Sequence, residues 1–290
     1  MIFDYFIVLI AVLYLIFASV SDIRKREVPD WLTYTLITLA LASRLIYSLS
    51  INDFYFFIAG IFGFVIFFAI ACIMYYSRQW GGGDAKLLMG LGALFGSWPG
   101  IFSQNIFWPF KIPFPHLLTL LVNILFAGAL YGIIAILFLM LRDWKNFKTK
   151  FREVMPNHLP FFVIFILILI EVVVLITNYP VILIVSIFLV FILLLILLFY
   201  IAKAVEETSM KKKVPVSELT EGDWPVNDVI VNKKIICRAD SLGLEADDIK
   251  LLKKSKTKFV WIKEGLPFIP AFLIGYLITL FLGNLLNYLI

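Results

Sequence analysis

The sequence predicts a membrane protein of the all-α class, a polytopic bundle of helices. Hydrophobic residues make up 62% of the 290 residues and charged residues only 16%, whereas soluble domains are about half apolar and a quarter charged. The mean hydropathy is +0.99, and several apolar runs have about 20 residues, enough for a helix to cross about 30 Å of hydrocarbon. A soluble helical domain would need segments with one polar face, and most of these runs have none.

About eight apolar segments are expected to be transmembrane helices. The fourth is short and rich in glycine, so we expect it to pack against its neighbours rather than to face lipid. The predicted segments are about 2–21, 31–50, 54–77, 84–98, 117–141, 159–178, 180–202 and 266–290. We therefore divide the chain into a transmembrane catalytic bundle, a cytoplasmic domain and a last transmembrane helix that packs with the bundle, at residues 1–202, 203–265 and 266–290.

The positive charges indicate how these segments are oriented in the lipid bilayer. Alternate loops, together with residues 203–265, hold 23 of the 25 lysines and arginines. Cytoplasmic loops carry an excess of basic residues, so we expect these loops inside the cell and both termini outside (N-out/C-out). This orientation places Asp22 and Asp84 at the cytoplasmic boundary of a multi-pass protein of the cell membrane. It also explains the net charge of +5 without a nucleic-acid partner.

Residues 203–265 are the only polar stretch long enough to fold outside the lipid. We expect a small α+β domain there, with Glu206–Lys213 as a charged linker and with Val229–Val231 and Phe259–Trp261 as short strands. Residues Leu244–Lys256 are predicted to form a helix between the strands. Its acidic start and basic end suit the helix dipole.

Asp22 and Asp84 carry the functional prediction. Asp22 closes the first segment, and Asp84 opens the fourth directly after Gly81, Gly82 and Gly83. Glycines let the backbone adopt positive φ or approach another group closely. An ionisable residue at a membrane span is costly and therefore suggests a function. Either acid alone is more simply interpreted as a solvated loop carboxylate, but two acids at matched depth favour a paired site.

A pair of carboxylates offers acid–base chemistry. Two carboxylates at equal depth on adjacent helices can share one proton. One can deprotonate a water molecule while the other protonates the leaving group, which is what peptide hydrolysis without a metal or a covalent nucleophile requires. We expect no metal and no cofactor, because the chain has only two histidines, and its two cysteines, Cys72 and Cys237, lie far apart in the sequence.

The run Gly81-Gly82-Gly83-Asp84 resembles the Gly-x-Gly-Asp signature of the intramembrane aspartic proteases. With Asp22 and the basic, proline-containing stretch after it, the chain resembles the archaeal type IV prepilin and preflagellin peptidases. Gly83–Leu88, Gly90–Leu94 and Trp261–Pro270 add to the resemblance, which covers the first four segments and the chain from about Ser217 onward. The sixth and seventh segments look like an additional hairpin.

The resemblance implies an aspartic endopeptidase that removes the short basic leader of pilin-like or archaellin precursors at the cytoplasmic membrane face. The residues that it assigns are the catalytic pair Asp22 and Asp84, the active-site loop residues Gly81, Gly82, Gly83 and Lys86, and the site-lining Pro267 and Pro270. Prolines that open a helix need no further role, however. Bacterial relatives often carry a four-cysteine zinc domain and methylate the new N-terminus. This chain lacks those cysteines, so we expect no methyltransferase activity.

Several alternatives stay open at this point. Asp30 competes with Asp22 as the first acid, although we favour Asp22 because it adjoins the helix end. A secondary transporter could use membrane carboxylates to couple ions or protons, but the sequence shows no related halves of the kind that transporters have. A non-enzymatic scaffold would leave the two acids unexplained. The oligomeric state is left open.

Arg44 and Glu171 are the remaining charged residues well inside apolar segments. Both lie roughly 18–20 Å from the cytoplasmic side at about 1.5 Å per helical residue. Because each is expensive to bury alone, we predict that they form a buried ion pair.

Overall fold

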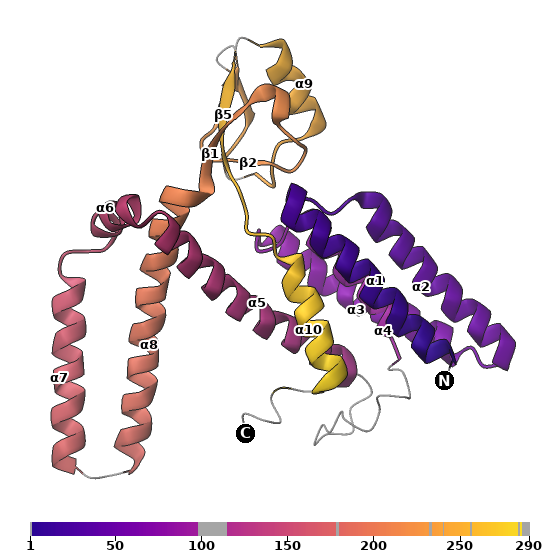
Figure 1. Cartoon of the computed structure of the whole chain (residues 1–290), viewed down its shortest axis with the longest axis horizontal. Helices are drawn as coiled ribbons and strands as arrows, with labels where there is room; N and C mark the ends of the chain where they lie inside the picture. The colour runs from indigo at the N-terminus through magenta and orange to yellow at the C-terminus, as the bar shows by residue number, and fades with distance from the viewer. Residues whose placement is uncertain are drawn as a thin grey trace. The chain divides into compact units, whose positions relative to one another are not determined.

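The structure is a computed structural model of the chain that describes residues 2–97, 115–177, 180–231, 234–239, 241–255, 257–283 and 285. The chain divides into two compact units, shown with the element labels in Figure 1. The first unit comprises Met1–Gly132, Asp240–Glu245 and Gly265–Ile290, and the second comprises Ile133–Ala239 and Ala246–Glu264.

The first unit is a bundle in which α1 to α4 lie side by side (Figure 1). Every helix of the unit contributes side chains to one apolar core, and the first half of α5 and the whole length of α10 take part in it. The helices are α1 (Ile2–Lys25), α2 (Asp30–Ile51), α3 (Tyr55–Tyr76), α4 (Gly82–Phe95), α5 (Pro115–Arg142) and α10 (Ile269–Phe281). Helix α1 continues three residues beyond Asp22, which therefore lies in the last turn of α1 rather than at its end.

Helix α4 packs backbone to backbone against α3. A Cβ atom on Gly92 would lie 2.3 Å from the carbonyl oxygen of Gly63, and one on Gly96 would lie 1.9 Å from the carbonyl oxygen of Ala59. Small residues at four-residue spacing allow this close approach between membrane helices. Nearly every residue from Ala85 to Phe95 is buried, so the prediction that the fourth segment packs against neighbours is confirmed.

Arg44 bonds to the C-terminal end of α4. Its Nη2 donates to the carbonyl oxygens of Leu94 (2.7 Å) and Ser97 (3.1 Å). Its Nη1 donates to the carbonyl oxygen of Phe56 and to Ser97 Oγ, both at 2.9 Å. The guanidinium is fully buried and satisfies carbonyls that a helix end leaves without partners. The side chain of Glu171 lies outside the described residues, so its pairing with Arg44 stays a prediction.

The second unit contains the second half of α5 and the helices α6 (Trp144–Val154), α7 (Leu159–Thr177) and α8 (Pro180–Val205). Helices α7 and α8 lie side by side as a hairpin (Figure 1). The sequence analysis did not predict α6. Its Phe147 is buried against Ala204 and Val205 at the end of α8, and Phe151 packs on the same cluster.

The rest of the second unit is a small α+β region with two antiparallel sheets. One has the strand order β1–β5–β2, and the other pairs β3 with β4. The elements are β1 (Lys211–Pro215), β2 (Trp224–Pro225), β3 (Val229–Val231), β4 (Lys234–Cys237), α9 (Ala246–Lys254) and β5 (Phe259–Lys263). The predicted strands at β3 and β5 and the helix at α9 are confirmed. The predicted linker is wrong, because Glu206–Met210 forms a helical turn and Lys211–Lys213 belong to β1, which pairs with β5.

Five helices of the described chain have the length and apolar composition to cross a membrane. They lie at Ile2–Lys25, Asp30–Ile51, Tyr55–Tyr76, His116–Arg142 and Ile184–Met210. Two shorter apolar helices lie at Phe161–Ile170 and Ile269–Phe281. A mostly helical chain with membrane spans and a small sheet region is what the sequence predicts. The number of eight spans and the orientation stay predictions.

Candidate active site

Asp22 is held by the N-terminus of a helix from the far end of the chain. Its side chain is 7% exposed, and Oδ2 accepts a hydrogen bond of 2.9 Å from the backbone N–H of Ile269, the first residue of α10. The first N–H groups of a helix have no partner within the helix, and they lie at the positive end of its dipole. The start of α10 therefore offers hydrogen bonds and favourable electrostatics to an ionised Asp22. Arg26, one turn along, adds a charge of opposite sign.

Asp84 is held by the N-terminus of α4. It is the third residue of that helix, and its Oδ2 accepts a hydrogen bond of 2.9 Å from the backbone N–H of Gly81, which precedes the helix. This is the return half of a capping box, in which an acid in the first turn binds the N–H of the capping residue. Asp22 lies close enough to Asp84 for the two carboxylates to repel each other electrostatically. The fold thus brings the two predicted acids together, each at a helix N-terminus.

Of the three glycines before Asp84, Gly83 fits most tightly. A Cβ atom on Gly83 would lie 2.9 Å from Val28 Cβ, in the connection between α1 and α2, and one on Gly81 would lie 3.4 Å from Asp84 Oδ2. A Cβ atom on Gly82 would only reach ordinary contact, 3.8 Å from the Tyr75 ring. Gly81 has an ordinary φ of −71°. Close approach therefore explains the third glycine of the run, and none of the three has a positive φ.

Trp80 joins the glycine loop to the start of α10. Its side chain is 4% exposed, and its ring centroid lies 5.8 Å from that of Phe268 and 5.2 Å from that of Phe272. Pro267 and Pro270 lie on either side of the Phe268-Ile269 pair, and Pro270 is in the first turn of α10. The two prolines therefore flank, in the sequence, the backbone segment whose N–H binds Asp22.

Sequence reasoning gave no role to Trp80, Ile269 or Arg26. The guanidinium of Arg26 donates a hydrogen bond of 2.7 Å to the carbonyl oxygen of Gly265, which ties the end of α1 to the segment before α10. Of these three residues, only Trp80 could have been singled out from the sequence, because it is a large aromatic residue directly before a glycine run. Every residue has a backbone carbonyl group and every residue except proline has a backbone N–H, so the sequence does not show which of these groups will bind a side chain.

Asp30, the alternative first acid, has a different partner. Its Oδ1 forms an ion pair of 2.5 Å with Lys86 Nζ, and the Asp30 side chain is 63% exposed. Lys86 also lies 5.2 Å from the ring centroid of Tyr34, within cation–π distance. Lys86, predicted as part of the active-site loop, is thus paired with Asp30, while Asp84 lies near Asp22.

The chemistry of this arrangement is that of an acid–base pair. Two carboxylates, each bonded to backbone N–H groups, can bind a water molecule and exchange protons with it. In the part of the chain that the structure describes, no three His, Cys, Asp or Glu side chains are placed to hold a metal ion.

Comparison with known proteins places this site in a matched region. Residues 9–136 match the type IV leader peptidase family, which confirms the resemblance seen in the sequence. The chain is 41% identical over 86 residues to a preflagellin peptidase of Methanococcus maripaludis, an alignment that covers 30% of this chain and 37% of the relative. It is 26% identical over 156 residues to a prepilin peptidase of Methanothermobacter thermautotrophicus (53% of this chain, 40% of the relative). It is also 26% identical over 280 residues to a preflagellin peptidase of Methanococcus voltae (95% of this chain, 94% of the relative).

Proposed function

Because the chain resembles the type IV leader peptidases, we propose that it is a membrane aspartic endopeptidase. Its substrates are archaellin or other pilin-like precursors, from which it removes the short basic leader at the cytoplasmic face of the cell membrane. The observation that carries the proposal is that Asp22 and Asp84 lie near enough to repel each other, each bonded to a backbone N–H at the N-terminus of α10 or α4. Both acids lie within the segment that matches the family.

The pair would hydrolyse a peptide bond with one shared proton. Repulsion between the carboxylates disfavours ionising both, and the helix N-termini favour ionising one. The ionised carboxylate takes a proton from water, whose oxygen attacks the carbonyl carbon of the substrate. The protonated carboxyl group then gives its proton to the leaving nitrogen as the C–N bond breaks. The proton taken from water remains on the first acid, so proton exchange restores the pair.

The geometry suits a substrate that is itself partly in the membrane. Asp22 and Asp84 occupy the first or last turns of apolar helices, near one end of the bundle. A precursor would place its apolar segment among the helices and its basic leader in the cytoplasm. The excess of lysine and arginine in alternate loops supports the cytoplasmic position of this end.

The test is cleavage of archaellin and pilin precursors by the full chain in membranes, comparing wild type with Asp22→Asn and Asp84→Asn. Removing an acid or base catalyst typically costs about 10²–10⁴-fold in rate, so both variants are expected to lose cleavage by at least about 100-fold. The matched control is Asp30→Asn, which removes a nearby carboxylate outside the pair and is expected to cleave at a rate close to wild type.

Three controls test whether a loss of cleavage comes from misfolding, from a different catalytic acid or from a different function of the protein. Unchanged thermal unfolding of the Asn variants in detergent shows that their loss is chemical. Cleavage by Asp22→Asn together with failure of Asp30→Asn would assign the first carboxylate to Asp30. If wild type cuts no precursor from a broad panel but moves protons or cations across proteoliposomes, the protein is a secondary transporter and the peptidase proposal fails.

A further inference from the structure

Helix α6 lies at the ends of two candidate membrane spans, α5 and α8. It begins two residues after α5 ends at Arg142, and its apolar stripe packs on Ala204 and Val205, the last residues of α8. Both α5 and α8 are candidate membrane spans. A short helix attached where two spans end lies at the depth of the lipid headgroups.

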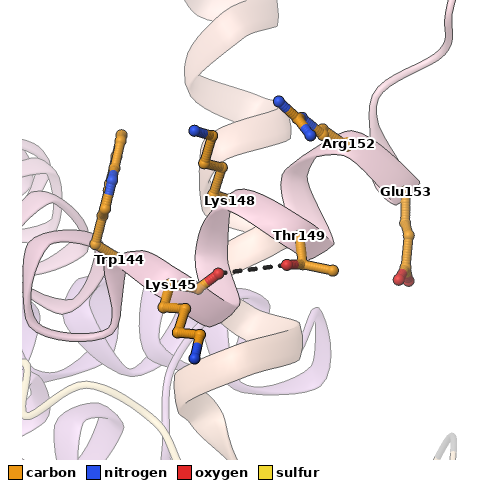
Figure 2. A pocket seen from close by; sticks show the side chains of 6 residues that line it. All are labelled: Trp144, Lys145, Lys148, Thr149, Arg152 and Glu153. Carbon is orange, nitrogen blue, oxygen red and sulfur yellow. Dashed lines mark hydrogen bonds between the residues drawn. The ribbon is translucent and has the colours of Figure 1, made fainter.

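The other face of α6 is basic. Trp144, Lys148 and Arg152 follow one another at four-residue spacing, which puts them on one stripe of a helix. Figure 2 shows these three side chains extending to the same side of α6. Together with Lys145, Thr149 and Glu153 they line a depression of about 680 Å³. The indole of Trp144 stacks on Phe147, with ring centroids 5.6 Å apart, and is 52% exposed.

The cations of this face are free to bind a ligand. No acid among the described residues forms an ion pair with Lys145, Lys148 or Arg152. Glu153, the acid at the edge of the depression, forms an ion pair with Lys150 at 2.5 Å. The depression is therefore lined by three positively charged side chains, one acid that is paired elsewhere and a half-exposed indole.

We propose that this face of α6, defined by Trp144, Lys148 and Arg152 with Lys145 beside them, binds the headgroup of an anionic phospholipid. Lysine and arginine at the cytoplasmic surface attract anionic lipids, and tryptophan favours the headgroup level. Arginine and lysine are also the side chains that bind phosphate oxygens. A basic leader peptide is excluded as the occupant, because it carries the same sign of charge. The lipid site goes beyond the proposed function and does not depend on the aspartate pair.

The test is lipid binding by the full chain in detergent, measured by native mass spectrometry with phosphatidylglycerol and with phosphatidylcholine as probes. Wild type is expected to bind phosphatidylglycerol more tightly. A Lys148→Gln/Arg152→Gln variant is expected to bind it about 25-fold more weakly, at about fivefold for each charge removed near a phosphate surface. The matched control is Lys253→Gln/Lys254→Gln, which removes two exposed charges from α9 and is expected to bind like wild type.

Three further results decide the interpretation. Lys148→Arg keeps the charge and is expected to keep the preference for phosphatidylglycerol, and an unchanged unfolding temperature of the double variant shows that it does not act through misfolding. Equal losses from the α6 and α9 variants would overturn the proposal, since binding would then follow net charge alone. Equal affinity of wild type for the two lipids would also overturn it, and an acidic protein segment would become the occupant to test.

Discussion

At the scale of single residues, Asp22, Asp84 and Asp30 differ in the groups that donate hydrogen bonds to their carboxylates. Asp22 and Asp84 accept hydrogen bonds from backbone N–H groups at two helix N-termini, whereas Asp30 is paired with a lysine. Neither Asp22 nor Asp84 forms an ion pair among the described residues, and each keeps one carboxylate oxygen that these backbone bonds do not use. Asp30 is committed to an exposed ion pair, an interaction worth about 0–1 kcal/mol. The difference in partners supports the proposal that Asp22 and Asp84, and not Asp30, form the acid–base pair.

Arg44 makes a residue-scale prediction about stability. Replacing it with methionine removes four hydrogen bonds and leaves the buried carbonyl group of Leu94 and the half-buried carbonyl groups of Phe56 and Ser97 without that donor. Hydrogen bonds to charged groups contribute about 1.5–3 kcal/mol each, and lost bonds at one site do not add fully. We expect Arg44→Met to lower the free energy of unfolding by about 3–5 kcal/mol, measured by thermal unfolding in detergent.

The control for Arg44 is an arginine without buried partners. Arg238 is exposed in the second unit, and Arg238→Met is expected to change stability by less than about 0.5 kcal/mol. Equal unfolding of Arg44→Met and wild type would contradict the bonding of Arg44 to the end of α4.

Sequence reasoning found the two acids but not the groups that hold them. Asp22 and Asp84 were recognisable because the two acids lie at matched depth at the ends of apolar segments and because glycines precede one of them. The partner of Asp22 is the N–H of Ile269, and the partners of Arg44 are mostly carbonyl oxygens. We predicted an acidic partner for Arg44 because burying an unpaired charge is costly. Hydrogen bonds to several carbonyl oxygens also lower that cost, and the sequence does not show them.

At the scale of elements, the position of α4 depends on glycines. A Cβ atom on Gly92 would lie 2.3 Å from the Gly63 oxygen and 2.7 Å from Phe67 Cβ, so Gly92→Ala forces α3 and α4 apart. Overpacking of this kind costs about 1–3 kcal/mol, and moving α4 also moves Asp84. We expect Gly92→Ala to lower both the unfolding temperature and the cleavage rate, measured on the same preparation.

Gly132 in α5 is the matched control for Gly92. No atom lies within 4 Å of a Cβ atom added there, and alanine favours a helix over glycine by up to about 1 kcal/mol. Gly132→Ala is expected to leave cleavage unchanged and to keep or raise the unfolding temperature. A Gly92→Ala protein as stable as wild type would contradict the close packing of α3 on α4.

The elements that the sequence analysis missed are short or amphipathic. Helix α6 has only 11 residues and no long apolar run, so a search for membrane spans passes over it. The spacing of Phe147 and Phe151, four residues apart, was its available signal. Strand β1 was misjudged because Lys211, Lys212 and Lys213 resemble a solvated linker. They form an edge strand, where lysines are common because they oppose pairing with other chains.

At the scale of the whole molecule, the distribution of basic residues makes a prediction about sidedness. With Cys72 and Cys237 replaced by serine, a cysteine at position 53, between α2 and α3, is expected to react with a membrane-impermeant maleimide added outside the cell. A cysteine at position 148 in α6 is expected to react only after the membrane is permeabilised. The measurement is labelling of intact and permeabilised cells, and the reverse pattern would place the aspartate pair on the outer face.

The hydrogen bond between Asp22 and Ile269 also has a consequence for biosynthesis. The two residues are 247 positions apart, so the ribosome makes one acid of the pair long before the helix that holds it. At about 5–20 residues per second, the interval is about 12–50 s. During that time the aspartates are in the nascent chain without the start of α10. For the proposed peptidase, the hydrogen bond that holds Asp22 therefore forms only after translation reaches α10, and cleavage is expected to begin only then.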